Sequence, residues 1–430
     1  MIFQAANIQL FKQQAMQWAA SFEVCCYLDS NHHTGAYAEF DALIAVGVTN
    51  EVTAQAGEAF KALAQFRQKY TGWITGFLGY DLKNELEQLT SQNSDNLQFP
   101  DLYFFVPKYL LIIRSNEVEI IADNTQQVWE LIHQQNIATP YHFPKLKLQS
   151  RFSKQEYIDT FDHIRQHIIR GDIYVTNFCQ EFFAEEAFVD PLTIFQELNR
   201  LSPTPFASFF KYHQQYILCA SPERFMAKRG NKLISQPIKG TAKRGRTIEE
   251  DEEIKLALRS NTKEQQENVM IVDLVRNDLT RSAEAGTVRT EELFGIYSFE
   301  QVHQMISTVT CQLQEGLSPV EAIRNTFPMG SMTGAPKLSA MQLMEHYERT
   351  RRGVYSGAIG YIGPNDNFDF NVVIRTILYN SANQYLSFQV GSAITFDADA
   401  EQEYAECLLK AQAILQVLSP LLKPPREGGL

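Results

Sequence analysis

Apolar runs of strand length, rich in aromatic residues, follow one another through the first 145 residues of the chain. The segments Ile74–Tyr80 and Leu102–Val106 are bounded by Gly or Pro, and each predicts a strand. Ala54–Lys69, which precedes both, predicts a short helix. The strongest apolar run, Tyr109–Ile113, also has the length of a strand, far below the roughly 20 residues of a membrane helix.

The pattern changes after Asn136–Leu148, a segment with two X-Pro steps that we interpret as a linker. Ser153–Glu156 has the form of a capping box and predicts a helix that runs to about Arg170. Strands and helices then alternate irregularly, without internal repeats or low-complexity blocks. The last residues, Pro424–Leu430, are expected to fray.

Composition narrows the possible partners of this chain. Its 430 residues carry 38 Lys and Arg against 50 Asp and Glu, a formal charge of −12 that argues against binding nucleic acid or an anionic membrane.

Six cysteines without a CxxC pair predict reduced core thiols. The N-terminus lacks a basic segment followed by an apolar one, so we expect no signal peptide and a cytoplasmic protein.

Two predicted helices each offer a pair of acids. In Asn261–Arg281 the middle is apolar nearly all round, which predicts a buried helix, and Glu264 and Glu267 share one stripe with Ile271. The alternative is that both acids lie in a solvated first turn and complement the helix dipole. Carboxylates that enter a core are costly unless they are paired or bound to a metal.

The second helix, Asp399–Leu415, places Glu403, Glu406 and Lys410 on one stripe. Taken alone, this pattern is more typical of a solvated Glu–Lys ladder. Two such helices together change the interpretation, because ligands that offer only oxygen suit Mg²⁺. We therefore predict a Mg²⁺ site between the two acid pairs.

A candidate nucleophile lies in Ser235–Thr241, where Lys239 precedes Gly240 and Thr241 at a predicted turn. Gly permits close approach to a ligand, and successive backbone N–H groups can hold a carboxylate. The alternative is a solvated cation; if the amine is desolvated, its neutral form is a nucleophile. Glu223, at a predicted strand end, is either a surface acid paired with Arg or a general acid near Lys239.

Three further segments are candidates for carboxylate binding. Gly330–Lys337 lacks the spacing of a phosphate-binding loop, so we interpret it as a turn before the helix Lys337–Tyr347. Tyr355 and Arg375 frame a predicted Gly-rich strand pair, 355–361 with 372–377. Arg375 either faces water from an edge strand or binds a carboxylate in a site. Gly391 offers another point of close approach.

Together these segments resemble the chorismate-utilising enzyme family, which includes anthranilate, aminodeoxychorismate, isochorismate and salicylate synthases. The motifs are SPERF at 221–225, PIKGT at 237–241, ENVMIVDLVRNDL at 267–279, GAPK at 334–337, YSGAIGY at 355–361 and EYAE at 403–406. The resemblance covers about 153–418, and GFLGYDL at 76–82 resembles the amino-terminal half of aminodeoxychorismate and anthranilate synthases.

The resemblance implies an α/β (α+β) fold of the anthranilate synthase component I type: a single large sandwich of two interleaved, mostly antiparallel sheets flanked by helices. Its expected parts are an N-terminal half of the sandwich at 1–145, a chorismate-binding catalytic region at 150–420 and a disordered tail at 421–430.

Two positions divide the family into branches. Relatives that resemble anthranilate synthase carry Ala where this chain has Lys239, whereas Lys there is typical of aminodeoxychorismate synthase component I. Relatives that add water carry a general-base Lys at the position of Val175. Val cannot accept a proton from water, so isochorismate and salicylate chemistry are disfavoured. Many amine-adding relatives have Gln at this position, so Val175 departs from their pattern.

The resemblance also implies a role for each candidate residue. Glu267 and Glu406 would bind Mg²⁺, Glu264 and Glu403 would act partly through water, Lys239 would attack chorismate and Glu223 would protonate its leaving hydroxyl. The remaining implied substrate-binding residues are Gly240, Thr241, His303, Ser331, Tyr355, Arg375, Gly391 and Lys410. Without the resemblance, His303 would be interpreted as a core histidine.

We see no Cys nucleophile of a glutaminase, so the expected partner is a glutamine amidotransferase subunit that supplies ammonia for amination of chorismate. The implied pathway is folate synthesis through 4-aminobenzoate. Two alternatives are anthranilate synthase component I and a non-catalytic chorismate-binding subunit. The second predicts loss of some acids, yet all five of the candidate acids are present.

Overall fold

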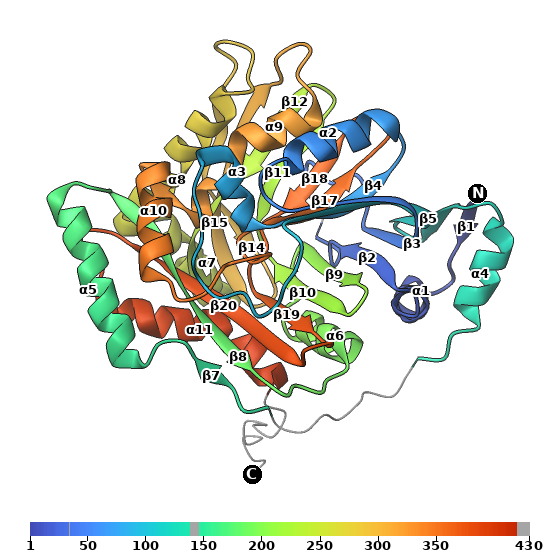
Figure 1. Cartoon of the computed structure of the whole chain (residues 1–430), viewed down its shortest axis with the longest axis horizontal. Helices are drawn as coiled ribbons and strands as arrows, with labels where there is room; N and C mark the ends of the chain where they lie inside the picture. Colours follow the sequence, from blue (N-terminus) through green and yellow to red (C-terminus); the bar gives the residue numbers. More distant parts are fainter. Residues whose placement is uncertain (34, 138–145, 419–430) are drawn as a thin grey trace.

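The computed structural model describes residues 1–33, 35–137 and 146–418 (Figure 1). Most of the predicted linker and the whole predicted tail at 421–430 lie outside the described residues. The helices are α1 Ile8–Ala20, α2 Ala59–Lys69, α3 Lys83–Glu87, α4 Thr125–His133, α5 Lys154–Arg170, α6 Pro191–Leu201, α7 Ile248–Ser260, α8 Thr262–Thr280, α9 Pro319–Thr326, α10 Lys337–Tyr347 and α11 Ala400–Leu418, with 3-10 turns η1 Tyr80–Leu82 and η2 Gly330–Met332.

The strands pair antiparallel and form one continuous hydrogen-bonded network across the described residues. They are β1 Ile2–Gln4, β2 Val24–Asp29, β3 Ala42–Ala54, β4 Ile74–Leu78, β5 Leu102–Arg114, β6 Glu117–Ile121, β7 Gln149–Ser150, β8 Val175–Ala184, β9 Phe206–Tyr212, β10 Gln215–Ser221, β11 Arg224–Arg229, β12 Lys232–Gln236, β13 Ile238–Lys243, β14 Arg289–Ser298, β15 Val302–Gln312, β16 Gly334–Ala335, β17 Ala358–Ile362, β18 Phe368–Asn371, β19 Thr376–Asn380 and β20 Tyr385–Ile394.

Strands from the first part of the chain are inserted within this network as one block: β2, β3, β5 and β4 pair in that order, with β9 on one side and β17 on the other. β2 pairs with β9, and β4 pairs with β17, so strands of the first 145 residues lie beside strands of the catalytic region. The predicted interleaved antiparallel fold is confirmed. Helices α5, α10 and α11 cover one side of the strands, and α2 and α9 cover another (Figure 1).

Successive side chains along the strands point alternately into two hydrophobic cores. In β3, Leu43 and Ala45 pack in one core with α2 and α8, whereas Ile44 and Val46 pack in the other with α1, α5 and α11. Successive side chains of a strand point to opposite faces, so a strand covered on both faces is apolar throughout. This accounts for the continuous apolar runs of the N-terminal segment.

Local capping chemistry sets the ends of the predicted helices. Ser153 and Glu156 form the capping box of α5, which ends at Gly171 in the left-handed conformation. Asn261 caps α8 by accepting from the Glu264 backbone N–H. The helix predicted over Ala54–Lys69 was too long at its start, since Ala54 belongs to β3 and α2 begins at Ala59.

Two predictions about burial and strand length need correction. α8 is amphipathic rather than buried all round: Val269 is 39% exposed and Asp273 faces solvent. The predicted strands Leu102–Val106 and Tyr109–Ile113 are one strand, β5. Pro107 does not break it, because the partner strand β3 has an irregularity in register beside this position, where a missing N–H is tolerated.

The six cysteines are all buried and free, as the sequence predicts. No helix of the described residues is long and apolar enough to cross a membrane.

Candidate active site

Lys239 stands on β13, which is bulged against β15 between Ile238 and Thr241. Gly240 has a φ of +98°, and a Cβ there would lie 3.3 Å from Glu264 Oε2 and 3.2 Å from Met305 Cβ. Gly is therefore needed for β13 to pass closely beneath α8. The predicted turn is instead a bulged strand, and Thr241 is exposed.

Glu223 lies in the short connection between β10 and β11, at a strand end as predicted. It is 5% exposed, and its backbone is held by Ser221 and Val372. Burial raises the pKa of Glu223 to about 7, although a hydrogen bond from Ser331 and the charge of Lys239 act in the opposite direction. Glu223 therefore exchanges a proton near neutral pH.

Lys239 is half-buried and faces three carboxyl groups. Its charge acts on Glu223, Glu264 and Glu406, lowering the pKa of each against the effect of burial. Across the described ranges its ammonium forms no direct ion pair. The charge of Lys239 thus acts both on Glu223 and on the acid cluster of α8 and α11.

The predicted acid pairs of α8 and α11 face each other. The Lys263 ammonium lies 3.9 Å from Glu267 Oε1 and 4.0 Å from Glu403 Oε1, which joins the two helices. Burial, reinforced by the charge of Glu406, raises the pKa of Glu403 to about 7. Glu264 behaves alike, its pKa raised by burial and by the charges of Glu267 and Glu406.

This donor set fits a divalent cation in its chemistry. The groups are oxygen ligands on two facing helices, and their mutual repulsion is the kind that a cation relieves. Among residues 1–33, 35–137 and 146–418, no three such side chains already converge on one point. Substrate or water would have to complete the coordination, which is usual for Mg²⁺.

Arg375 departs from its predicted place. The expected strand 372–377 is interrupted, because Arg375 has a φ of +51° between β18 and β19. β17 pairs with β18 and β4 instead of with that segment. Burial lowers the pKa of Arg375 while the nearby Glu223 carboxylate opposes this, so the guanidinium lies close to the candidate acid.

The other predicted ligand-binding positions surround the same region. Lys410 donates to the carbonyl of Gly391 at 3.0 Å and forms an ion pair with Glu406 at 2.7 Å. A Cβ at Gly391 would lie 2.9 Å from Asn177 Nδ2, so only Gly fits there. Tyr355 is 3% exposed, and Ser331 is half-buried in η2.

His303 is fully buried in β15, and both of its ring nitrogens have partners. Nε2 lies 2.8 Å from Asp251 Oδ1 and Nδ1 lies 2.9 Å from Ser298 Oγ. Arg244, which also binds Asp251, is the main cause of the strongly lowered pKa of that carboxyl. The role of His303 toward substrate stays a prediction, and its ring is held by α7 and β14.

Three buried ion pairs near these residues were missed from the sequence: Asp251 with His303, Lys337 with Asp278, and Arg352 with Glu348. Lys337 lies in the GAPK motif and Asp278 lies in the ENVMIVDLVRNDL motif. These motif positions could have indicated that both residues have a structural or functional role. The Lys337 ammonium also donates to two backbone carbonyls, which fixes the loop before α10 to α8.

Val175, the departure within the family pattern, is 5% exposed in β8 and pairs with Ala335. A cavity of about 540 Å³ has Pro222 and Ile238, the neighbours of Glu223 and Lys239, in its lining, and contains none of the predicted site residues themselves. The predicted site residues lie around Glu223, Lys239 and the two helices.

A family model described as chorismate binding enzyme matches residues 23–416. The chain belongs to the chorismate binding enzyme family. The match reaches well into the N-terminal half, beyond the 153–418 expected from the motifs. Family membership confirms the resemblance on which the fold prediction rested, and explains why strands from both ends of the chain form one structure.

The relatives of this chain are named after two different enzymes, anthranilate synthase and aminodeoxychorismate synthase. The chain is 34% identical over 357 residues to the anthranilate synthase component I-like protein of Synechocystis, covering 81% of this chain and 73% of that one. It is 32% identical to aminodeoxychorismate synthase component 1 of Bacillus subtilis, covering 81% and 77%. The crystal structure of anthranilate synthase component I from Streptococcus pneumoniae has the same fold, with a TM-score of 0.76, 24% identity, and coverage of 89% and 95%.

Proposed function

We propose that this chorismate-binding enzyme is an aminodeoxychorismate synthase component I. It would convert chorismate and ammonia into 4-amino-4-deoxychorismate, the precursor of 4-aminobenzoate. The observation that carries the proposal is that the charge of Lys239 acts both on Glu223 and on Glu264 and Glu406 of the acid cluster. The names of several relatives support the same activity.

The reaction divides one difficult substitution into two easier ones. The neutral Lys239 amine attacks C2 of chorismate, the two conjugated ring double bonds shift toward C4, and the C4 hydroxyl leaves as water after protonation by Glu223. Ammonia then attacks C4, the two double bonds shift back, and the Lys239 amine is expelled from C2. The atoms balance as chorismate plus ammonia giving aminodeoxychorismate plus water. Glu223 suits its role because a carboxyl with a pKa of about 7 is available in its protonated form at neutral pH.

Positively charged and donor groups would hold the two carboxylates of chorismate. Arg375, Tyr355 and the backbone N–H groups of Gly240, Thr241 and Gly391 would orient the ring for attack. Glu264, Glu267, Glu403 and Glu406 would hold Mg²⁺. When bound, the ion would neutralise the ring carboxylate and draw electron density from the ring.

Ammonia would come from a separate glutamine amidotransferase subunit. Relatives named as component 1 imply a partner subunit, and this chain shows no glutaminase nucleophile. Its six cysteines are buried, and burial raises the pKa of each thiol, which is the opposite of what a cysteine nucleophile requires.

The test compares the wild type, Lys239→Ala and Lys243→Ala with chorismate, Mg²⁺ and ammonium. Lys243 lies on the same strand but is exposed, which makes it the matched control. We expect aminodeoxychorismate from the wild type and from K243A, and a rate loss on the order of 10³-fold in K239A.

Without ammonia, the wild type should accumulate an adduct of chorismate less one water, detectable by intact mass, and K239A should not. Equal rates and equal product from K239A and the wild type would contradict the covalent step.

Anthranilate synthase component I is the alternative that the relatives themselves suggest. It predicts anthranilate, which has lost the enolpyruvyl side chain, and a mass spectrum of the product separates the two. Lys239, in place of the Ala of that branch, favours the first proposal.

A further inference from the structure

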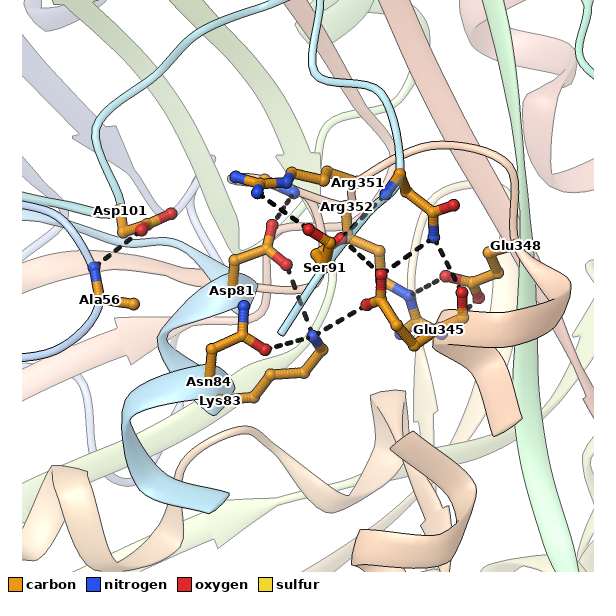
Figure 2. Close-up of polar contacts among 12 residues, drawn as sticks. Ala56, Asp81, Lys83, Asn84, Ser91, Asp101, Glu345, Glu348, Arg351 and Arg352 are labelled. Atoms are coloured by element: carbon orange, nitrogen blue, oxygen red, sulfur yellow. Dashed lines mark hydrogen bonds and ion pairs between the residues drawn. The ribbon is translucent and has the colours of Figure 1, made fainter. Parts of the chain in front are cut away.

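A buried cluster of charges connects the N-terminal segment to the end of α10 (Figure 2). The Lys83 ammonium, which is almost fully buried, lies 3.1 Å from Glu345 Oε2 and 3.6 Å from Asp81 Oδ1. Asp81 in turn accepts from the backbone N–H of Gly353 at 3.0 Å. These contacts fix the chain immediately after α10, around Arg352, against the N-terminal half.

Arg352 is 2% exposed and has acceptors on several sides of its guanidinium. Nε and Nη2 donate to the two oxygens of Glu348 at 2.9 and 2.6 Å. Nη1 donates to the carbonyl of Met332 at 2.6 Å, and Nη2 donates to the carbonyl of Asn177 at 2.8 Å. Glu348 also accepts from the Cys179 N–H at 3.0 Å. The planar fork thus joins η2 to β8.

Each of these contacts adjoins a residue of the proposed active site. Met332 directly follows Ser331, which lines the same small cavity as Glu223 and lowers the pKa of the Glu223 carboxyl against the effect of burial. Asn177 packs against Gly391. The Tyr355 N–H donates to the carbonyl of Arg352 itself at 3.0 Å.

We propose that Arg352 is a positioning residue that holds Ser331, and through it the Glu223 carboxyl, in place for catalysis. Glu348 orients the guanidinium, and the Asp81 contact with Gly353 fixes its backbone. The inference rests on the proposed function in one respect, the role of Glu223 as the acid. It assigns a task to a buried charge pair that the chemistry itself does not use.

The alternative is that the pair only stabilises the fold. A buried ion pair is seldom more stable than apolar residues of the same volume, so stability alone explains it poorly. Lys cannot reproduce the planar fork, although it keeps the charge. Arg352→Lys therefore tests geometry apart from charge. Arg352→Met with Glu348→Met removes both charges without leaving one unpaired.

Arg67 provides the matched control. It is 6% exposed and donates to Asp366 and to the carbonyls of Tyr70, Gly72 and Gly363, as Arg352 does with its own acceptors. None of these contacts adjoins the predicted site. Arg67→Met measures what the loss of a buried, carbonyl-binding Arg does by itself.

We expect R352K to lower kcat about 10- to 100-fold, because small misplacements of catalytic groups have effects of this size. The pH at which activity falls should move upward, since Ser331 no longer stabilises the Glu223 carboxylate. Ser331→Ala should produce the same movement, and the R352K/S331A double variant should move no further. R67M should leave this pH unchanged.

Three outcomes would overturn the proposal: no movement of that pH in R352K, additive effects of R352K and S331A, or failure of both Arg352 variants to fold. The last would show that Arg352 is required for the fold itself. Folding is checked by circular dichroism and thermal melting before any rate is compared.

A second readout separates this proposal from the proposed function. The Glu223 carboxyl can be titrated by NMR in protein labelled with ¹³C-glutamate, with Glu223→Gln for assignment. If the wild type makes no aminated product but R352K still shifts this titration, the proposed function fails and the positioning role stands. If amination proceeds and the titration does not move, the positioning role fails alone.

Discussion

Glu223 is a buried carboxyl whose lost hydration is only partly compensated. Ser221 and Val372 hold its backbone, while Ser331, the Ile238 backbone and the charges of Lys239 and Arg375 lower the pKa of its carboxyl less than burial raises it. A carboxyl with few donors in a dry site keeps its proton to higher pH than one in water. Its chemistry therefore depends on its place between β10 and β11.

This predicts a pH profile for the amination. The acid must be protonated, so kcat/KM should fall as the pH rises above about 7, compared at a fixed concentration of unprotonated ammonia. Glu223→Gln should lower kcat/KM by about 10²–10³-fold and remove this dependence. Glu181→Gln, at a buried carboxyl paired with Arg151, should keep it. A falling limb that persists in E223Q would assign the acid to another group.

At the scale of single residues, the candidate residues could be located from motifs, whereas their tertiary partners could not. Lys239 and Glu223 stand in short motifs whose chemistry is local. Asp251 lies 52 residues from its partner His303, and no spacing rule connects them. The sequence also gives no signal for the left-handed conformation at position 375, because Arg is not one of the residues, such as Gly and Asn, that commonly adopt it.

At the scale of elements, helices were easier to place than strands. The caps of α5 and α8 are local side-chain hydrogen bonds, so Ser153 and Asn261 show their starts directly. Strand ends depend on partners far along the chain. The continuity of β5 through Pro107 is decided by the irregularity in β3, which only the paired structure reveals.

The facing starts of α8 and α11 lead to a prediction about Mg²⁺. Their acids repel one another, and bound Mg²⁺ should stabilise the protein by about 2.7 kcal/mol at 100 times its Kd. The Glu403→Gln/Glu406→Gln double variant should lose this effect, measured as the rise in melting temperature on adding Mg²⁺. Glu401→Gln, an exposed acid of the same helix, should keep it. The same rise in the double variant would place Mg²⁺ elsewhere.

At the scale of the whole molecule, the interleaved topology came from the family resemblance and not from the pattern of apolar residues. Periodicity identifies a strand but does not identify its partner, and β4 finds β17 almost 300 residues away. The same interleaving is what brings Asp81 against Gly353, and so links the N-terminal half to the segment between α10 and β17.

Buried acids distributed over this fold make its stability depend on pH, and Asp81, Glu223 and Glu403 are three of them. Burial is the main cause that raises the pKa of Asp81 to about 6, and of Glu223 and Glu403 to about 7, from ordinary values near 4. Because the pKa of each acid is higher in the folded state, its contribution to the free energy of unfolding is fully present below about pH 4. That contribution is lost as the pH rises through 6 to 7.

Without Mg²⁺, the free energy of unfolding should therefore be greater at pH 5.5 than at pH 8, because each of these acids costs the folded state on the order of 1–3 kcal/mol when it ionises. Carboxyls with a lowered pKa, such as Glu156 and Glu291, lose their contribution only at much lower pH and do not mask the effect. Urea titrations of Glu403→Gln should show a smaller difference between the two pH values than the wild type. Glu315→Gln, at an exposed position, should show the wild-type difference. If the free energy of unfolding changes equally between the two pH values in E403Q and the wild type, then burial and repulsion do not destabilise the charged acids of α8 and α11. The argument for a cation between these helices would then lose its physical basis.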